Sequence, residues 1–280
     1  MYALEVSNLK KKYPSFYLDN VNLKIKKGVI TGFIGRNGAG KSTTLNCIMD
    51  FVHANGGEIS FFGKDFKAGQ NEIKQKVGFV SSGMVYYPKS KIKTITAITK
   101  SFFDNWDESA YKRYIGMFDI DENKTPENLS SGMKIKYALA LALSHKAELL
   151  ILDEPTSGLD PVSRDELLDV FLDLCAEGIS ILFSTHITSD LDKCADDIIY
   201  IKQGKIYAQS ALDDFINSYR LVKIDKGDIT EDMKKSFIGL RRTKNGMTAL
   251  IKAEDENFVS GDISVPDLES LMIHLEKEVI

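Results

Sequence analysis

Apolar and polar residues alternate along the start of the chain. Within residues 2–31, the segments ALEVSNL and FYLDNVNLKIKKG have the period of two that is typical of half-buried strands, and Tyr13–Pro14 between them predicts a turn. The run VITGFIG predicts a buried strand, KSTTLNCIMDFV has helical spacing, GGEISFFGKDF predicts a hairpin, and KVGFVSS predicts another buried strand. The chain therefore begins with an antiparallel part and a strand–helix unit.

Residues 88–145 have a different pattern. Three amphipathic segments predict separate helices: ITAITKSFFDNW, DESAYKRYIGMFDI and SGMKIKYALALALSHK. Buried strands follow in ELLILDEP, in ISILFSTH and as a pair in DDIIYIKQGKIYAQ, with the helix DPVSRDELLDVFLDLCAEG between the first two. Because strands that alternate with helices form parallel sheets, we predict an α/β fold: a doubly wound, mostly parallel sheet with an antiparallel β subdomain and a helical subdomain at about residues 88–145.

The pattern changes again after residue 215. RLVKID predicts a strand, RRTKNGMTALIKA a hairpin around Asn245–Gly246, and VPDLESLMIHLEKEVI an amphipathic helix. We therefore expect two domains: residues 1–215, and a small α+β domain or dimerisation extension at residues 216–280.

Composition narrows the class of protein. The 280 residues are 43% hydrophobic, enough for a sizeable core, and the net charge of -4 is not the footprint of a general nucleic-acid binder, so we expect no nucleic-acid partner. No run approaches the roughly 18 apolar residues of a membrane span, so no direct membrane insertion is expected. The three cysteines form no paired framework, which indicates a reducing, cytoplasmic location.

The segment GRNGAGKST fits the phosphate-binding loop pattern G-x-x-x-x-G-K followed by Ser or Thr, and it lies between a predicted strand and a predicted helix. A Gly-rich turn that arose by chance would need neither a strand before it nor a helix after it. The backbone N–H groups of such a loop cradle phosphate oxygens, Lys41 should reach the β- and γ-phosphates, and Ser42 should ligate Mg²⁺. The chain is therefore predicted to be a P-loop NTPase that binds ATP through Gly35, Arg36, Asn37, Gly38, Ala39, Gly40, Lys41, Ser42 and Thr43.

The segment ELLILDEP supplies a second half to this site. Its apolar strand ends in Asp153, which can hold Mg²⁺, usually through water, and then Glu154, which could accept a proton from an attacking water. Many buried strands end in acidic turns, so this segment indicates a nucleotide site only in combination with the phosphate loop upstream.

Asp153–Glu154 is followed by PTSGLDP, with LSSGM upstream and STH downstream. These motifs, in this order over residues 3–215, resemble the nucleotide-binding subunit of an ABC transporter. The resemblance implies an ATP hydrolase in which two subunits sandwich two ATP molecules, each between the phosphate loop of one subunit and the signature loop of the other. Glu154, His186 and Lys41 would be its catalytic residues.

The resemblance assigns further roles. Tyr13 would stack on adenine, although an ordinary strand-end tyrosine is the alternative, and Asp160 in SGLD would communicate across the dimer. His186 would be the switch histidine that contacts the γ-phosphate, at the carboxyl end of a strand where such sheets bind ligands. We expect the other histidines to lie on surfaces or helix faces: His53, His145 and His274.

Two motifs depart from the family pattern. The usual signature LSGGQ reads LSSGM here; it keeps Ser130 and Gly132, which would contact the γ-phosphate of the opposing ATP, and it opens a predicted helix that Ser130 caps in either case. Where the family carries a glutamine that ligates Mg²⁺, the matching position is Ser82, whose hydroxyl has a shorter reach.

Residues 102–121 and 131–161 resemble a branch of bacterial exporter ATPases for drugs, antimicrobial peptides and toxins. That branch implies a separate membrane permease, contacted near residues 82–105, a homodimer or a heterodimer with a related ATPase subunit, and a place at the inner face of the membrane.

One rival function is that of a clamp acting on ribosomes or DNA, which would carry tandem cassettes or a long coiled coil. A second is a sensor that binds ATP but hardly hydrolyses it; Glu154 argues against it, whereas Ser82 and Ser131 leave it open.

Overall fold

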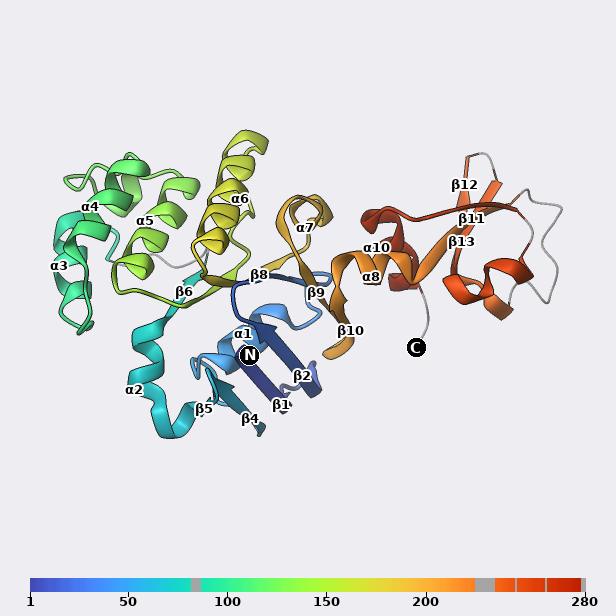
Figure 1. The fold of residues 1–280 in the computed structure, drawn as a ribbon, viewed down its shortest axis with the longest axis horizontal. Coiled ribbons are helices and arrows are strands. Elements are labelled where there is room, and N and C mark those ends of the chain that lie inside the picture. The colour runs from blue at the N-terminus through green and yellow to red at the C-terminus, as the bar shows by residue number, and fades with distance from the viewer. Residues whose placement is uncertain (82–86, 225–234, 245, 260, 278–280) are drawn as a thin grey trace. The chain divides into compact units, whose positions relative to one another are not determined.

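The computed structural model describes residues 1–81, 87–224, 235–244, 246–259 and 261–277 (Figure 1). The chain divides into two compact units, Met1–Tyr207 and Ala208–Ile280. This division lies ahead of the boundary that the hydrophobic pattern predicts after residue 215.

A six-stranded sheet is the centre of the first unit, with the order β10-β9-β3-β8-β7-β6. The pairs β3–β8, β3–β9, β7–β8 and β6–β7 are parallel, and every residue of β3, β7, β8 and β9 is buried, as strands covered on both faces must be. The predicted doubly wound, mostly parallel sheet is confirmed. Its strands are β3 (Ile30–Ile34), β6 (Val77–Ser81), β7 (Leu149–Asp153), β8 (Ser180–Thr185), β9 (Asp197–Lys202) and β10 (Lys205–Ala211).

A second sheet contains the strands that the alternating pattern predicts at the start of the chain. Its order is β2-β1-β4-β5, with β1 antiparallel to both β2 and β4. The apolar residues that alternate in β1 and β2, such as Leu4 and Leu18, share one core with Phe33 and Leu182 of the central sheet. The strands are β1 (Tyr2–Lys12), β2 (Tyr17–Lys26), β4 (Gly56–Phe61) and β5 (Lys64–Asp65).

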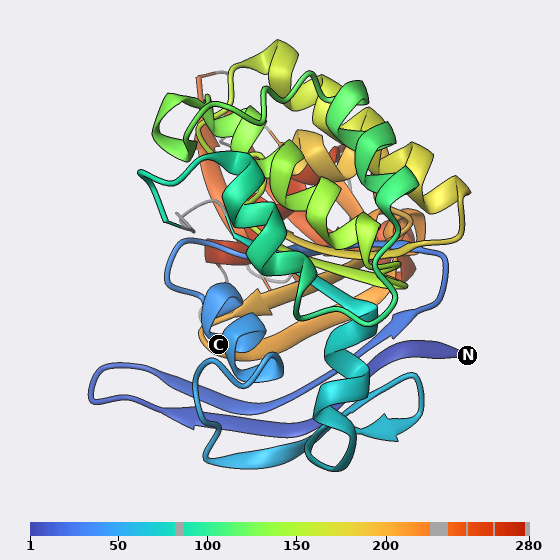
Figure 2. The same ribbon diagram turned by 90° about the vertical axis from the view of Figure 1, so that its left-hand side faces the viewer.

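The helices of the first unit fall into two groups. Figures 1 and 2 show α3, α4 and α5 gathered at one end of this unit and the β2-β1-β4-β5 sheet at the opposite end. The predicted helical subdomain is thus confirmed, and its helices lie between Ile92 and Ser144. The helices are α1 (Lys41–Ile48), α2 (Phe66–Lys76), α3 (Ile92–Lys100), α4 (Glu108–Met117), α5 (Ser131–Ser144), α6 (Pro161–Ala176) and α7 (Thr188–Cys194), with a 3-10 turn at Pro126–Asn128.

His145, expected on a surface or a helix face, is buried at the C-terminal end of α5, where it joins the helical end to α2. Its ring stacks on Phe103 with centroids 3.8 Å apart, and its Nδ1 lies 2.9 Å from the Gln75 carbonyl oxygen. The Gln75 side chain in turn bonds the Phe102 carbonyl and the Asp104 N–H. These contacts hold the chain after Lys100 in an irregular path, so α3 ends earlier than the pattern ITAITKSFFDNW predicts.

The pH dependence of stability should report on His145. Burial is the largest influence and lowers the pKa of His145 below its ordinary value of 6.5. Well above pH 6.5 both the folded and the unfolded chain hold this ring neutral. As the pH falls through 6.5, the unfolded chain binds the proton first and stability is lost. We expect His145→Gln to flatten this loss by at most about 1.4 kcal/mol per pH unit.

Thermal unfolding of the two proteins between about pH 7.5 and about pH 5 measures the difference. His53→Gln is the matched control, because the His53 side chain is 86% exposed. An equally steep loss of stability in His145→Gln would contradict the assignment.

The second unit contains a four-stranded sheet with the order β12-β13-β11-β14, in which α10 packs against β12 and β13. The predicted strand, hairpin and terminal helix are confirmed, with Asn245 outside the described residues. His274 lies on a helix face, as expected, and is buried there; its Nδ1 is 2.6 Å from the Gly239 carbonyl oxygen. The elements are α8 (Leu212–Asn217), β11 (Tyr219–Ile224), β12 (Ile238–Thr243), β13 (Gly246–Lys252), a 3-10 segment (Ala253–Phe258), β14 (Asp262–Ser264) and α10 (Leu268–Lys277).

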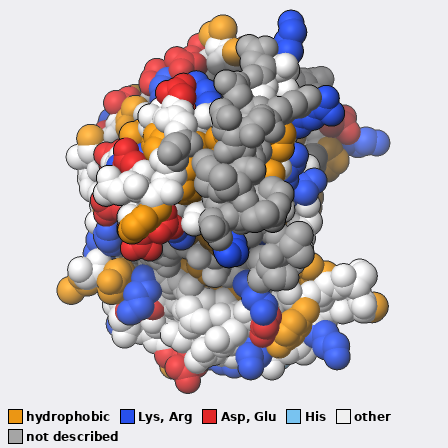
Figure 3. Space-filling view, turned by 90° about the vertical axis from the view of Figure 1, so that its right-hand side faces the viewer, with side chains coloured by type: hydrophobic (Ala, Val, Ile, Leu, Met, Phe, Trp, Pro, Cys, Tyr) orange, Lys and Arg blue, Asp and Glu red, His pale blue; other side chains and the backbone are white. Residues whose placement is uncertain are grey.

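Side chains of both charge signs are interspersed over the visible part of the face in Figure 3. In the part of the chain that the structure describes, no helix combines the length and the apolar composition that crossing a bilayer needs.

Candidate functional site

The loop between β3 and α1 approaches its neighbours closely at two glycines. A Cβ at Gly35 would lie 2.4 Å from the Ile201 carbonyl oxygen, so only glycine fits there. Gly40 has φ +116°, a left-handed conformation that favours glycine, and it directly precedes α1. This turn directs the first N–H groups of α1 outward, where a helix N-terminus attracts anions.

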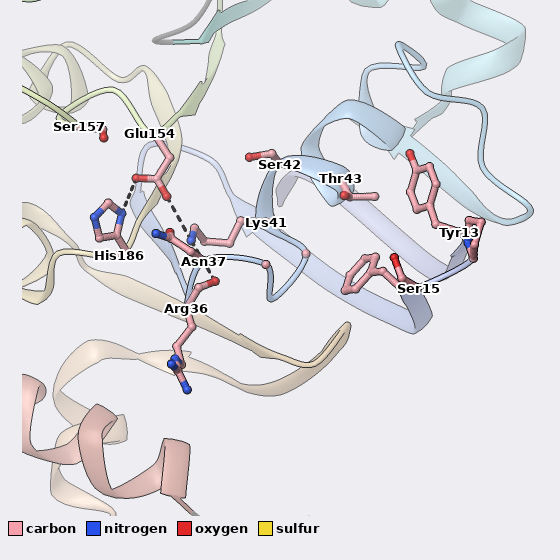
Figure 4. A pocket seen from close by; sticks show the side chains of 14 residues that line it. Tyr13, Ser15, Arg36, Asn37, Lys41, Ser42, Thr43, Glu154, Ser157 and His186 are labelled. Carbon is pink, nitrogen blue, oxygen red and sulfur yellow. Dashed lines mark hydrogen bonds and ion pairs between the residues drawn. The ribbon is translucent and has the colours of Figure 1, made fainter.

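An open cleft of about 820 Å³ lies over this loop (Figure 4). Figure 4 shows Tyr13 at the far end of the cleft from Glu154 and His186. The cleft is lined by Tyr13, Pro14, Ser15, Phe16, Arg36, Asn37, Gly38, Gly40, Lys41, Ser42, Thr43, Glu154, Ser157 and His186. An elongated ligand with a flat ring at one end and phosphates at the other fits this arrangement.

Lys41 is the first residue of α1, and its side chain is only 5% exposed. Its Nζ donates to the Gly35 carbonyl oxygen at 2.7 Å and lies 3.1 Å from Glu154 Oε1. The Arg36 guanidinium, by contrast, is turned away from the Lys41–Glu154 pair (Figure 4). Lys41 is therefore the loop cation that can meet phosphate oxygens inside the cleft.

Asp153 ends β7 as a buried carboxylate beside the loop. Ser42 Oγ donates to Asp153 Oδ1 at 3.0 Å, and Ser184 Oγ donates to the same oxygen at 2.7 Å. The parallel register sets Asp153 opposite Ser184 of β8. A hydroxyl and a carboxylate so close together form an all-oxygen donor pair of the kind that Mg²⁺ prefers.

Glu154 connects the loop cation to the histidine. Its Oε1 pairs with Lys41, its Oε2 lies 2.8 Å from His186 Nδ1, and its backbone has φ +51°, unusual for a residue other than glycine. The Ser184 hydroxyl receives the Glu154 N–H at 2.9 Å and so supports this turn. Backbone strain of this kind often accompanies functional sites, and here it directs the carboxylate into the cleft.

The structure brings most of the predicted residues together but sets three of them elsewhere. Ser130 caps α5 and accepts the Met133 N–H at 3.2 Å, which confirms the capping role, and Gly132 follows in the first turn of α5. Asp160 caps α6, and its hydrogen bonds, the largest from the Ser163 side chain, lower the pKa of its carboxyl. None of these three lines the cleft described above.

Ser82, predicted to contact the metal, lies outside the described residues. Two other residues of the site lie within the quoted motifs but were given no role: Ser184 of STH, which bonds both Asp153 and Glu154, and Ser157 of PTSGLDP, which lines the cleft. The signals for Ser184 were its place in STH and a polar residue within the apolar strand ISILFST. Ala39 is buried within the loop, as its place between two predicted phosphate-binding glycines requires.

The phosphate loop follows β3, His186 follows β8, and Asp153 and Glu154 lie at the end of β7. Because β3, β8 and β7 are adjacent and parallel, all three segments meet at one edge of the sheet. This fold and this site define a P-loop ATPase.

The chain belongs to the ABC transporter family, whose model matches residues 18–157. It is 31% identical over 214 residues to the bacitracin transport ATP-binding protein BcrA of Bacillus licheniformis, covering 75% of this chain and 70% of that one. It is 33% identical over 214 residues to the lantibiotic transport ATP-binding protein SrtF of Streptococcus pyogenes, covering 75% and 91%.

Among solved structures, an ATP-binding subunit of an ABC transporter superposes with a TM-score of 0.68 and 28% identity, covering 76% of this chain and 91% of that one. The chain is therefore an ATP-binding and ATP-hydrolysing subunit of an ABC transporter. Subunits of this family dimerise and act with membrane permease subunits.

Proposed function

We propose that this chain powers the export of a drug, an antimicrobial peptide or a toxin through separate permease subunits. The observation that carries the proposal is the convergence of Lys41, Ser42, Glu154 and His186 in one cleft, with Asp153 bonded to Ser42 beside it. The similarity to relatives that transport bacitracin and lantibiotics supports the substrate class. The subunit would lie in the cytoplasm, at the inner face of the membrane, held there by its permease.

Mg²⁺ would be held by Ser42 and Asp153. Both are hard oxygen donors within 3.0 Å of each other, and Mg²⁺ commonly takes only one or two protein ligands, with water and phosphate oxygens completing its shell. When bound, the ion would supply charge neutralisation at the β- and γ-phosphates.

The remaining chemistry would belong to side chains of this cleft. Lys41 would exchange part of its contact with Glu154 for phosphate oxygens, since both are anionic partners for the same Nζ. Glu154 would then accept a proton from the attacking water, and His186, already bonded to Glu154, would orient that carboxylate and contact the γ-phosphate. Tyr13 would stack on adenine at the other end of the cleft.

Ser130, Gly132 and Asp160 would act on the second ATP-binding subunit of a pair, either a copy of this chain or a related one. Their position away from the cleft supports this role, because a group that serves the opposing nucleotide has to face outward. ATP would drive closure by binding the closed pair more tightly than the open one.

The permease would contact the chain near residues 82–105. Within the described part of that segment, Tyr87, Ile98 and Phe102 are large apolar side chains with 62%, 44% and 71% of their surface exposed. Exposed apolar residues grouped on one segment are typical of a protein contact.

Purification of the tagged chain from detergent-solubilised membranes of its source tests the proposal. A membrane-spanning subunit should co-purify in a fixed ratio, and ATP turnover should change when that subunit is removed. Cells that express the complex should resist bacitracin or a lantibiotic better than cells that express it with Glu154→Gln. Co-purification with ribosomes or DNA, and no membrane subunit, would overturn the proposal.

A further inference from the structure

A fully buried carboxylate, Asp190, lies next to the site in α7. Its Oδ2 accepts two hydrogen bonds, from Thr156 Oγ1 at 2.6 Å and from Thr185 Oγ1 at 3.0 Å. A buried carboxylate is costly unless it is bonded in this way. Thr156 lies in the loop after β7 and Thr185 ends β8, so Asp190 joins segments that are far apart in the sequence.

These two segments carry Glu154 and His186. Thr156 is two residues after Glu154, and Thr185 directly precedes His186. Ser184 holds the left-handed turn of Glu154 at its N–H, and the Thr156–Asp190 bond holds the chain just beyond that turn. The 2.8 Å contact between Glu154 Oε2 and His186 Nδ1 therefore depends on both anchors.

The second oxygen of Asp190 faces Arg164. Asp190 Oδ1 lies 3.9 Å from Arg164 Nε, and among the described residues both atoms are buried without a hydrogen-bond partner. Arg164 is in the first turn of α6, the helix that Asp160 caps, and its Nη2 lies 3.5 Å from the Leu159 carbonyl oxygen. A small approach of the two side chains would satisfy both orphan atoms, which favours such a movement.

The two helices are fastened together on the outside as well. Lys193 of α7 pairs with Asp165 and Asp169 of α6, and the two helices lie side by side (Figure 1). Through these contacts a displacement at the start of α6 would reach α7 and Asp190.

We propose that Asp190 is a positioning residue for ATP hydrolysis, which holds the Glu154 and His186 loops together and, through Arg164, couples them to the start of α6. The inference rests on the roles that the proposed function gives to Glu154, His186 and Asp160. It adds a route by which contact of Asp160 with a second subunit sets the relative position of Glu154 and His186.

Variants of the purified full-length chain test separately the contact of Asp190 with the threonines and its contact with Arg164. Thr156→Val removes one hydroxyl from the carboxylate and should lower kcat about tenfold to a hundredfold, because small misplacements of a catalytic group cost that much, while KM for ATP stays within about twofold. Thr156→Ser keeps the hydroxyl and should restore kcat. Thr188→Val, at the start of α7 outside this network, is the matched control.

Asp190→Asn keeps an acceptor for both threonines but loses the charge that faces Arg164. We expect Asp190→Asn and Arg164→Met each to lower kcat about tenfold. The kcat of the double variant should be no lower than that of the less active single variant, as for two residues that act through one contact. Thermal midpoints of all variants are measured in parallel. If Asp190→Asn does not fold, the comparison of Thr156→Val with Thr156→Ser decides.

Equal kcat losses in Thr156→Val and Thr156→Ser, or independent losses in Asp190→Asn and Arg164→Met, would overturn the inference. Glu154→Gln is assayed alongside. If Glu154→Gln is inactive while Asp190→Asn and Thr156→Val turn over as wild type, the inference alone fails. Wild-type turnover in Glu154→Gln would instead show that the proposed site roles are wrong.

Discussion

Glu154→Gln should abolish steady-state ATP turnover while ATP remains bound. The substitution keeps the shape of the side chain but removes the only carboxylate that contacts both Lys41 and His186 in the described cleft. Loss of a general base costs about a hundredfold to ten-thousandfold in rate. Because a neutral amide attracts Lys41 less strongly than a carboxylate does, the cation is freer to meet phosphate oxygens, and ATP affinity should be unchanged or higher.

Phosphate release measures turnover, and size-exclusion chromatography with Mg-ATP shows whether the unhydrolysed nucleotide traps a dimer. Glu166→Gln is the control, because Glu166 pairs with Lys136 on the exposed side of α6. Turnover at the wild-type rate in Glu154→Gln would remove this residue from the chemistry.

Lys41→Ala should abolish tight ATP binding. Lys41 is the buried cation of the phosphate loop, and its loss also leaves Glu154 without its counter-charge beside an anionic ligand. Charge-assisted hydrogen bonds contribute about 1.5–3 kcal/mol each, so losing two weakens binding on the order of a hundredfold or more. Equilibrium dialysis with Mg-ATP gives Kd directly.

Lys112→Ala, which changes an exposed lysine of α4, controls for net charge. Unchanged ATP affinity in Lys41→Ala would contradict the assignment of the phosphate loop. Circular dichroism of both variants separates lost binding from lost folding.

Local hydrophobic patterns predicted most strands, because the burial pattern of a strand is visible in a short run of neighbouring residues. The helix α2 was not predicted: only Phe66 and Ile73 of its residues are buried, and Gly69 interrupts it with a non-helical φ of -119°. A weak apolar stripe and an internal glycine leave no helical period to read. The early end of α3 was missed for another reason, since Gln75 and His145, distant in sequence, redirect the chain there.

The sequence by itself determined the phosphate loop, the acidic end of β7 and the order of the motifs, because loop conformation and strand burial follow from spacing and from glycine. Only the tertiary structure decided that Ser184 supports Asp153 and Glu154, since the parallel register of β7 and β8 sets them opposite each other. It also decided that Asp190 joins Thr156 to Thr185. Contacts between loops of different strands depend on the packing of the whole sheet, and no local pattern records that packing.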